Sequence, residues 1–165
     1  MARKVLISIA TITTLSVIAL AATKPNFSGT WTMDRARSFG LPGNMNQTMV
    51  ITHKEEQIEV ETKLIQPGNE RVVKDTYILD GKEHEFTPQA APNQPPAKGK
   101  RTVNWLPGDK GITVTEVTTA ETPKGPVTTQ VVRKWTISSQ GELVIDMYVD
   151  NPNVSYEAKR IFKKQ

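Results

Sequence analysis

The chain has 165 residues, a formal net charge of +4 and no cysteine. This length suits one domain with a sizeable core, and the missing thiols exclude disulfides, thiol catalysis, cysteine-based zinc sites and iron–sulfur clusters. Removing Arg3 and Lys4 leaves a charge of +2, so the composition does not indicate nucleic-acid binding, which normally needs basic residues clustered on one face.

Residues 1–21 are typical of a secretory signal peptide. Arg3 and Lys4 precede a mostly apolar stretch, and Ala19-Leu20-Ala21 forms a small-x-small cleavage site. We therefore expect cleavage after Ala21, a single domain over residues 22–165, and a periplasmic or secreted protein. A membrane anchor is the alternative, but the stretch is short, contains threonines and is followed by no stop-transfer charges.

The rest of the chain consists of short alternating runs rich in Val, Ile and Thr, separated by turn residues. This pattern is typical of an antiparallel sandwich or barrel, and no window keeps a helical period. We predict an all-β, up-and-down meander barrel of about 8–10 strands. The ten candidate strands lie near residues 28–33, 47–53, 57–65, 70–79, 83–87, 100–106, 111–121, 127–138, 142–149 and 154–163.

Two connections are longer than a hairpin turn. Residues 34–46 have room for a single helical turn over the mouth of the barrel. Residues 88–98 contain too much proline for a strand. This second segment is either an exposed linker of polyproline type or a lid or docking loop.

Hairpin pairing places three charged residues on an inward face. A four-residue loop at 107–110 pairs Arg101 with Glu116, and a turn centred on Lys124-Gly125 pairs Glu116 with Arg133. The same face carries apolar residues, so the row Arg101, Glu116 and Arg133 should point into the barrel. Trp105, Trp135, Met147 and Tyr156 are the predicted walls beside it.

This row has three interpretations. It is a solvated rim of the barrel, or it is a polar pocket with surplus positive charge that suits a carboxylate or another anion, because buried charges must be paired or wet. A register slip of one residue would instead turn the row outward.

Polar residues also interrupt two other inward faces. Arg160 lies in an otherwise apolar row of the last hairpin, and Asp75, Tyr77 and His84 fall on the inward face of the N-terminal half. These residues would add polar atoms to the interior.

Gly29-Thr30-Trp31 in the first strand, together with Arg160 near the end of the last, resembles the calycin superfamily of lipocalins and fatty-acid-binding proteins. The resemblance implies that Trp31 stacks under Arg160 and that Gly29 belongs to the same closure of the barrel base. The stretch Asn26-Phe27-Ser28-Gly29-Thr30-Trp31-Thr32-Met33-Asp34, with Ser38 and Ile51-Thr52-His53, is also similar to small exported bacterial lipocalin-like proteins of uncharacterised function.

The chain departs from that superfamily in two places. Ten strands match the fatty-acid-binding type, yet residues 34–46 are too short for the helix-turn-helix lid of those proteins. Their Arg-x-Tyr carboxylate clamp is missing from the last strand, where Tyr156 precedes Arg160. The resemblance therefore implies a barrel but does not carry fatty-acid binding to this chain.

No local motif indicates catalysis. Glu83, His84 and Glu85 are adjacent on a strand and point to alternate faces, so we expect no metal site there. His53 lies next to a hairpin turn, and the chain has no nucleophile elbow, zinc-protease motif or phosphate loop. A pair of catalytic carboxylates needs no local pattern and stays open.

The sequence thus favours an exported, monomeric barrel that needs no cofactor and binds an apolar or amphipathic small molecule with a polar or anionic group. One alternative is a protein-interaction or envelope-stress module with a filled barrel. A barrel enzyme is the third hypothesis.

Overall fold

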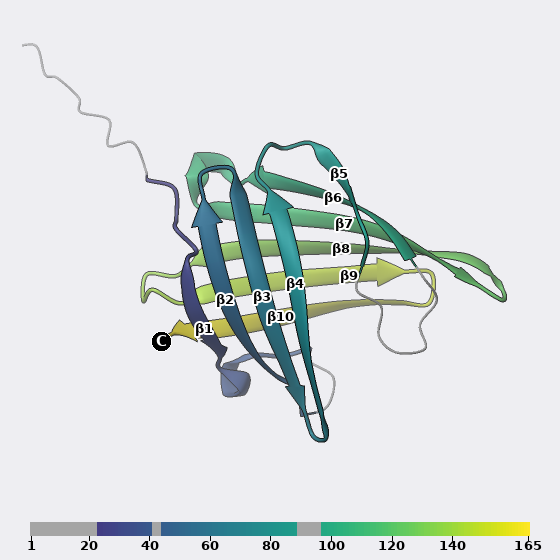
Figure 1. Ribbon diagram of the computed structural model, residues 1–165, viewed down its shortest axis with the longest axis horizontal. Helices are drawn as coiled ribbons and strands as arrows, with labels where there is room; N and C mark the ends of the chain where they lie inside the picture. The colour runs from purple at the N-terminus through teal and green to yellow at the C-terminus, as the bar shows by residue number, and fades with distance from the viewer. Residues whose placement is uncertain (1–22, 41–43, 89–96) are drawn as a thin grey trace, which may run out of the picture.

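The computed structural model describes residues 23–40, 44–88 and 97–165 (Figure 1). The predicted signal peptide and most of the proline-rich segment lie outside these residues. The structure is all-β, with ten antiparallel strands: β1 (Gly29–Met33), β2 (Asn46–Lys54), β3 (Gln57–Gln66), β4 (Asn69–Ile78), β5 (Glu83–Phe86), β6 (Ala97–Trp105), β7 (Gly111–Thr122), β8 (Gly125–Ile137), β9 (Leu143–Asn151) and β10 (Val154–Lys164).

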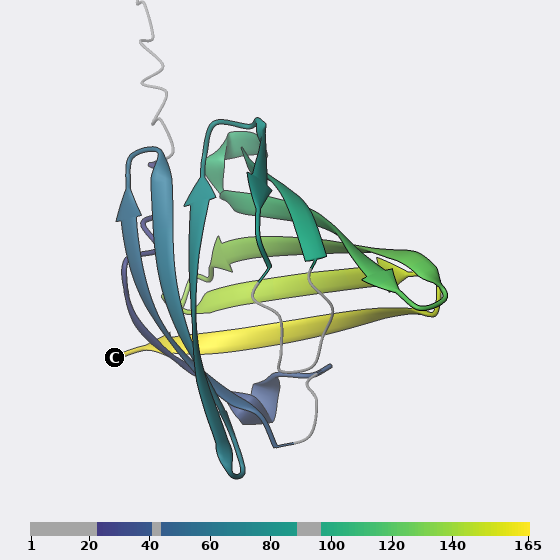
Figure 2. The same cartoon turned by 45° about the vertical axis from the view of Figure 1, so that its right-hand side comes forward.

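The strands form one sheet in the order β4-β3-β2-β1-β10-β9-β8-β7-β6-β5. β1 pairs with β2 on one side and with β10 on the other, so the first and last strands join the two halves of the sheet. Both views show β2–β4 running across β7–β10, which places the two halves as opposing walls (Figures 1 and 2). The predicted up-and-down barrel is confirmed.

The barrel is nearly closed. No backbone ladder joins β4 to β5 in the described chain, and these two strands are the edges of the sheet. We call the opening between them the seam. The expected helical turn in residues 34–46 is a short 3-10 segment, η1 (Arg35–Arg37), and a second one, η2 (Pro107–Asp109), precedes β7. Within the described ranges, no helix is long and apolar enough to cross a membrane.

Side-chain alternation explains why these segments form strands. Along β9, Leu143, Ile145, Met147 and Val149 are buried, while Tyr148 between them is exposed. An inward apolar residue at every second position is what a half-buried antiparallel strand requires. The core between the walls contains the fully buried side chains Phe27, Trp31, Ile58, Ile112, Leu143 and Phe162.

The predicted registers are confirmed on one side of β7 and shifted on the other. Arg101 lies opposite Glu116 as expected. On β8, however, Glu116 lies opposite Val131 and Arg133 lies opposite Val114. The turn consists of Pro123 and Lys124, because Thr122 pairs with Gly125 and donates its hydroxyl to the Gly125 carbonyl. The shift is two residues, and an even shift keeps every side chain on its predicted face.

The cation over Trp31 is not the expected one. Strand β10 continues to Lys164, which pairs with Trp31 and holds its Nζ 5.5 Å from the centre of the indole. Arg160 lies four residues earlier on the same strand, roughly 14 Å away at about 3.4 Å per residue. Gly29 belongs to this closure, because a Cβ there would lie 2.4 Å from Cε of Lys164. The expected stacking of Arg160 on Trp31 is not seen among the described contacts, where Lys164 is the cation over this indole.

Candidate functional site

A cavity of about 250 Å³ lies inside the barrel between the two walls. Strands β2, β3 and β4 supply one side, and β8, β9 and β10 supply the other. Its apolar lining includes Met45, Met49, Val60, Leu64, Trp135 and Ile145. Its polar lining includes Gln47, Arg71, Asp75, Arg133 and Arg160.

The three predicted charged residues form one ion-pair network. Glu116 accepts from Nε of Arg101 at 2.6 Å through one carboxylate oxygen, and from Nη1 of Arg133 at 2.6 Å through the other. Arg101 and Glu116 are both buried. The row is therefore neither a solvated rim nor turned outward.

The network keeps its acid ionised. Burial alone would raise the pKa of Glu116, but the charges of Arg133 and Arg101 lower it below its ordinary value. Glu116 is thus a buried carboxylate with both oxygens engaged, and its role is to hold two guanidinium groups in place.

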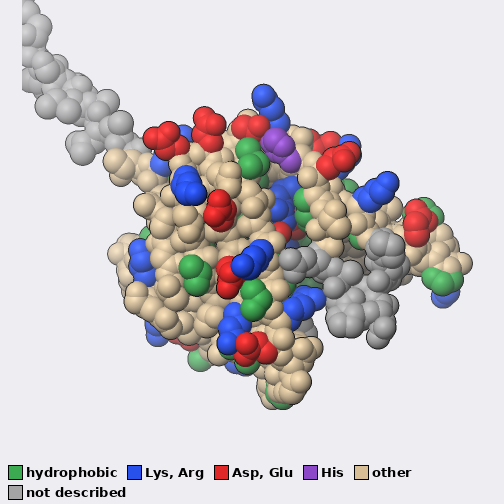
Figure 3. All heavy atoms as spheres, viewed as in Figure 1, with side chains coloured by type: hydrophobic (Ala, Val, Ile, Leu, Met, Phe, Trp, Pro, Cys, Tyr) green, Lys and Arg blue, Asp and Glu red, His purple; other side chains and the backbone are tan. Residues whose placement is uncertain are grey.

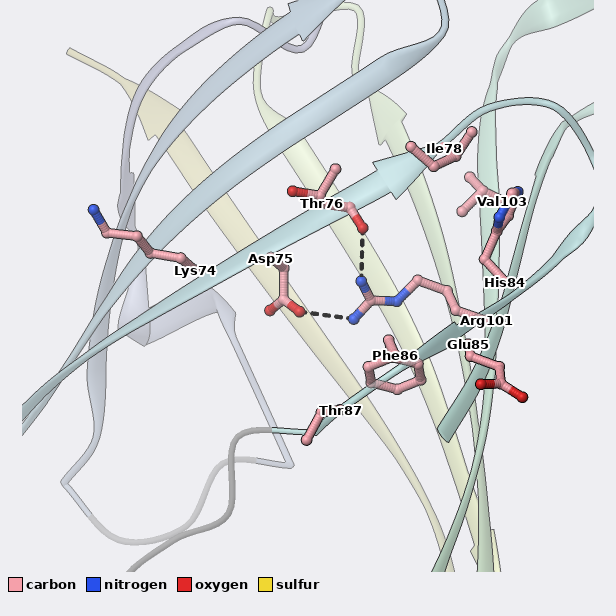
Figure 4. Close-up of a pocket in the computed structure, with 10 residues that line it drawn as sticks. All are labelled: Lys74, Asp75, Thr76, Ile78, His84, Glu85, Phe86, Thr87, Arg101 and Val103. Atoms are coloured by element: carbon pink, nitrogen blue, oxygen red, sulfur yellow. Dashed lines mark hydrogen bonds and ion pairs between the residues drawn. The ribbon is translucent and has the colours of Figure 1, made fainter. Parts of the chain in front are cut away.

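Arg101 also spans the seam. Its Nη1 donates to the carbonyl of Thr76 at 2.8 Å, and its Nη2 donates to Asp75 at 2.7 Å, both on β4 (Figure 4). The guanidinium lies between two rings, with its carbon 4.3 Å from the centre of Tyr77 and 4.1 Å from that of Phe86. Side chains from β4, β5 and β6 therefore join the edges where no backbone ladder does.

The ring of Phe86 reaches Arg101 because of a glycine. Phe86 lies opposite Gly99 on β6, and a Cβ at Gly99 would come within 2.5 Å of the Phe86 ring. A larger residue at this position would collide with the Phe86 ring, so the ring or the strand would have to shift.

Arg160 has no ionic partner among the residues that the structure describes. Its Nε is buried and makes no hydrogen bond within that part of the chain. Burial lowers the pKa of Arg160 to about 10, and the nearby charge of Arg133 acts in the same direction. The partly buried guanidinium thus lacks the carboxylate partner that charges in a protein interior generally have.

The polar lining of the cavity is consequently electropositive. Arg101 and Arg133 are balanced by Asp75 and Glu116, as described above. Arg71 and Arg160 line the same cavity without an ion pair among the described side chains. The interior therefore carries two positive charges in excess.

The four predicted wall residues separate in the structure. Trp135 lines the cavity. Trp105 does not line this cavity: its ring stacks on His53 at 6.0 Å, Lys24 lies over it, and these three side chains border a separate pocket. Met147 packs in a smaller cluster with Val149 and Ala158, and Tyr156 is 42% exposed. The predictions for Trp105, Met147 and Tyr156 as cavity walls are not supported by this geometry.

The wall formed by β2–β4 contributes residues that were not among the predicted ligand contacts. Gln47 and Arg71 line the cavity, as do Asp75 and Tyr77 from the inward face of β4. Alternation along β4 is the signal that places Arg71 on the same side as Asp75 and Tyr77. His84 lies at the edge of the seam and its Nε2 contacts Asp80 at 3.0 Å.

No metal centre is formed by the described residues, since no three His, Asp or Glu side chains gather at one point. Basic and acidic side chains alternate over the face seen in Figure 3 and do not separate by sign. In comparisons with known proteins, no family model matched the chain and no curated protein matched it.

Proposed function

We propose that this protein binds a compact, partly apolar molecule with an acidic group inside its barrel, and that Arg160 contacts the acid. The observation that carries the proposal is Arg160, a partly buried side chain that lines the cavity, whose buried Nε has no hydrogen-bond partner and whose guanidinium has no carboxylate partner in the described chain.

The energetics favour an anionic ligand over a neutral one. An unpaired buried charge destabilises a fold by several kcal/mol, and pairing removes much of that penalty. Hydrogen bonds to charged groups contribute about 1.5–3 kcal/mol each, and a guanidinium can bind a carboxylate with two parallel bonds. The excess positive charge of the lining acts in the same direction.

The volume limits the size of the ligand. About 250 Å³ is just below the ~300–1,000 Å³ that is usual for ligand sites. A short or ring-containing acid fits such a volume better than a long chain. The apolar lining by Met49, Leu64, Trp135 and Ile145 would cover the rest of the molecule.

We also propose that the protein belongs to a calycin-like group and that it is exported. The ten-stranded meander is compatible with the barrel that Gly29-Thr30-Trp31 suggested. Residues 1–21 have the composition of a signal peptide, so we place the protein in the periplasm or outside the cell, as a monomer.

The enzyme hypothesis is less well supported. A carboxylate pair needs one acid with a raised pKa. Asp75 lines the cavity and Glu116 is paired with Arg133 of its lining, and both carboxylates are held by Arg101. An interaction module remains the alternative, since Phe39 (53% exposed) and Tyr148 border a groove on the outer face of β8–β10.

Isothermal titration calorimetry with a matched pair of probes tests the proposal. 4-Ethylbenzoate and neutral 4-ethylbenzamide have the same shape and differ in charge. We expect the acid to bind more tightly, and Arg160→Met to abolish the difference. Lys134→Met is the matched control, because it removes one positive charge from the outer face of β8. Equal binding of acid and amide by the wild type would contradict the proposal.

A further inference from the structure

Trp135 carries a second unsatisfied donor in the same cavity. The side chain is 2% exposed and lines the cavity, yet its indole Nε1 has no hydrogen-bond partner in the part of the chain that the structure describes. The indole of Trp31 shows what is normal in this fold, since its Nε1 donates to the carbonyl of Phe27 at 2.9 Å. Buried indole N–H groups usually have such a partner, and an exception needs an explanation.

The two unsatisfied donors lie in one row of the sheet. Trp135 on β8 and Arg160 on β10 are both directly opposite Ile145 on β9. All three side chains line the cavity. With neighbouring strands about 4.8 Å apart, the two Cα atoms are separated by roughly 10 Å. One small molecule can therefore reach both donors.

The indole is also held in place by its neighbours. Its ring meets Phe27 edge-on at 6.1 Å and Tyr77 at 5.4 Å between ring centres. Tyr77 in turn lies against the guanidinium of Arg101. The position of the indole is thus fixed by packing before any ligand arrives.

The two donors differ in the acceptor that suits them. A guanidinium is charged and forms its best hydrogen bonds with a carboxylate. An indole N–H is a single neutral donor, which suits a carbonyl, ether or hydroxyl oxygen. The acid would therefore lie at Arg160, and an uncharged oxygen at Trp135.

From this arrangement we infer that the ligand is an acid with a second acceptor oxygen, such as a keto or acyl-substituted acid, and that Trp135 selects for that oxygen. This inference rests on the proposed function. It excludes a plain fatty acid as the preferred ligand, because its only polar group is the carboxylate and the indole would stay unpaired.

Matched pairs of probes test the inference. Each keto acid is compared with the acid that has a methylene group in place of the ketone: 4-oxopentanoate with pentanoate, 6-oxoheptanoate with heptanoate, and 4-acetylbenzoate with 4-ethylbenzoate. The three pairs cover different separations of the two oxygens. We expect a preference of about fivefold to tenfold for the keto acid in at least one pair, the size of one well-placed neutral hydrogen bond.

The variant Trp135→Phe keeps a ring in the cavity and removes the N–H. It should bind the plain acids and lose the preference for the keto acid. Trp105→Phe is the matched control, since that indole stacks on His53 outside the cavity, and it should keep the preference. In the wild type, the Nε1–H proton resonance of Trp135 should move downfield when the preferred keto acid is added, which requires no variant to fold.

The outcomes separate the two claims. If plain acids bind through Arg160 but all three pairs bind equally, or if Trp135→Phe keeps the preference, the inference is wrong and the proposed function stands. If no acid binds, both are wrong.

Discussion

Arg160 and Arg133 should respond in opposite directions to the same substitution. Both are partly buried arginines that line the cavity, but Arg133 is paired with Glu116 and Arg160 has no carboxylate partner among the described residues. We predict that Arg160→Met stabilises the ligand-free protein and that Arg133→Met destabilises it.

The magnitudes follow from the surroundings of each guanidinium. Lowering the pKa of Arg160 to about 10 corresponds to roughly 3 kcal/mol of penalty on the charged form. Because the side chain is only partly buried, solvent screening reduces this figure, and we expect a gain of about 1–2 kcal/mol. Removing one partner of a buried pair costs about 3–5 kcal/mol. Glu116 keeps Arg101, so for Arg133→Met we expect a loss of roughly 2–3 kcal/mol.

Urea unfolding at pH 7, without ligand, measures both effects from the midpoint at constant m-value. Lys134→Met, on the outer face of β8, is the control and should stay within about 0.5 kcal/mol of the wild type. Destabilisation of the protein by Arg160→Met, to the same degree as by Arg133→Met, would refute the claim that Arg160 is unpaired in the interior.

Three further predictions concern the ion-pair network of Glu116, the seam and His53. Glu116→Gln leaves two interior arginines without their shared carboxylate and should lower the free energy of unfolding by about 3–5 kcal/mol, whereas Glu121→Gln, exposed on the same strand, should leave it nearly unchanged. Gly99→Ala places a Cβ 2.5 Å from the Phe86 ring and should cost about 1–3 kcal/mol, with loss of the ring-current shift on the side chain of Arg101; an unchanged spectrum would contradict the packing described for the seam. Burial holds the pKa of His53 below its ordinary value, and its Nδ1 accepts from the Phe27 N–H, so the folded state favours the neutral ring. The contribution of the neutral His53 ring to the free energy of unfolding is fully present above the unfolded pKa of about 6.5. It is lost as the pH falls through the lower folded pKa. His53→Gln should therefore flatten the dependence of the free energy of unfolding on pH between 7.5 and 5, measured by urea unfolding at each pH. A slope equal to that of the wild type would contradict the claim that the fold favours the neutral ring.

The charged row could be predicted because its signal is local. Arg101 and Glu116 occupy inward positions of apolar strands, and the short loop between β6 and β7 fixes which residues lie opposite. The register of the hairpin formed by β7 and β8 is harder to predict, because the sequence Pro123-Lys124-Gly125-Pro126 is compatible with more than one turn. The error of two residues left Arg133 on the correct face, since side chains alternate with a period of two.

The cavity itself could not be predicted from local patterns. Its lining joins β2–β4 with β8–β10, and which part of each strand meets the other wall depends on how the whole sheet curves. Met147 and Tyr156 share the inward face of β9 and β10 with Ile145 and Arg160, yet they lie beyond the cavity. The cation over Trp31 is Lys164 and not the expected Arg160 for the same reason. The register between β1 and β10 joins residues at opposite ends of the chain, and no local turn fixes it.

The central claim is that Arg160 binds the acidic group of a ligand inside the barrel. The most direct measurement is the ¹⁵N–¹H resonance of Arg160 Nε during titration with 4-ethylbenzoate, assigned by its loss in Arg160→Met. The account predicts a saturable shift of this resonance, with no comparable shift of the Arg101 Nε resonance, because Arg101 stays paired with Glu116. A resonance that does not move at saturating acid, or binding of 4-ethylbenzoate to Arg160→Met that is as tight as to the wild type, would contradict it.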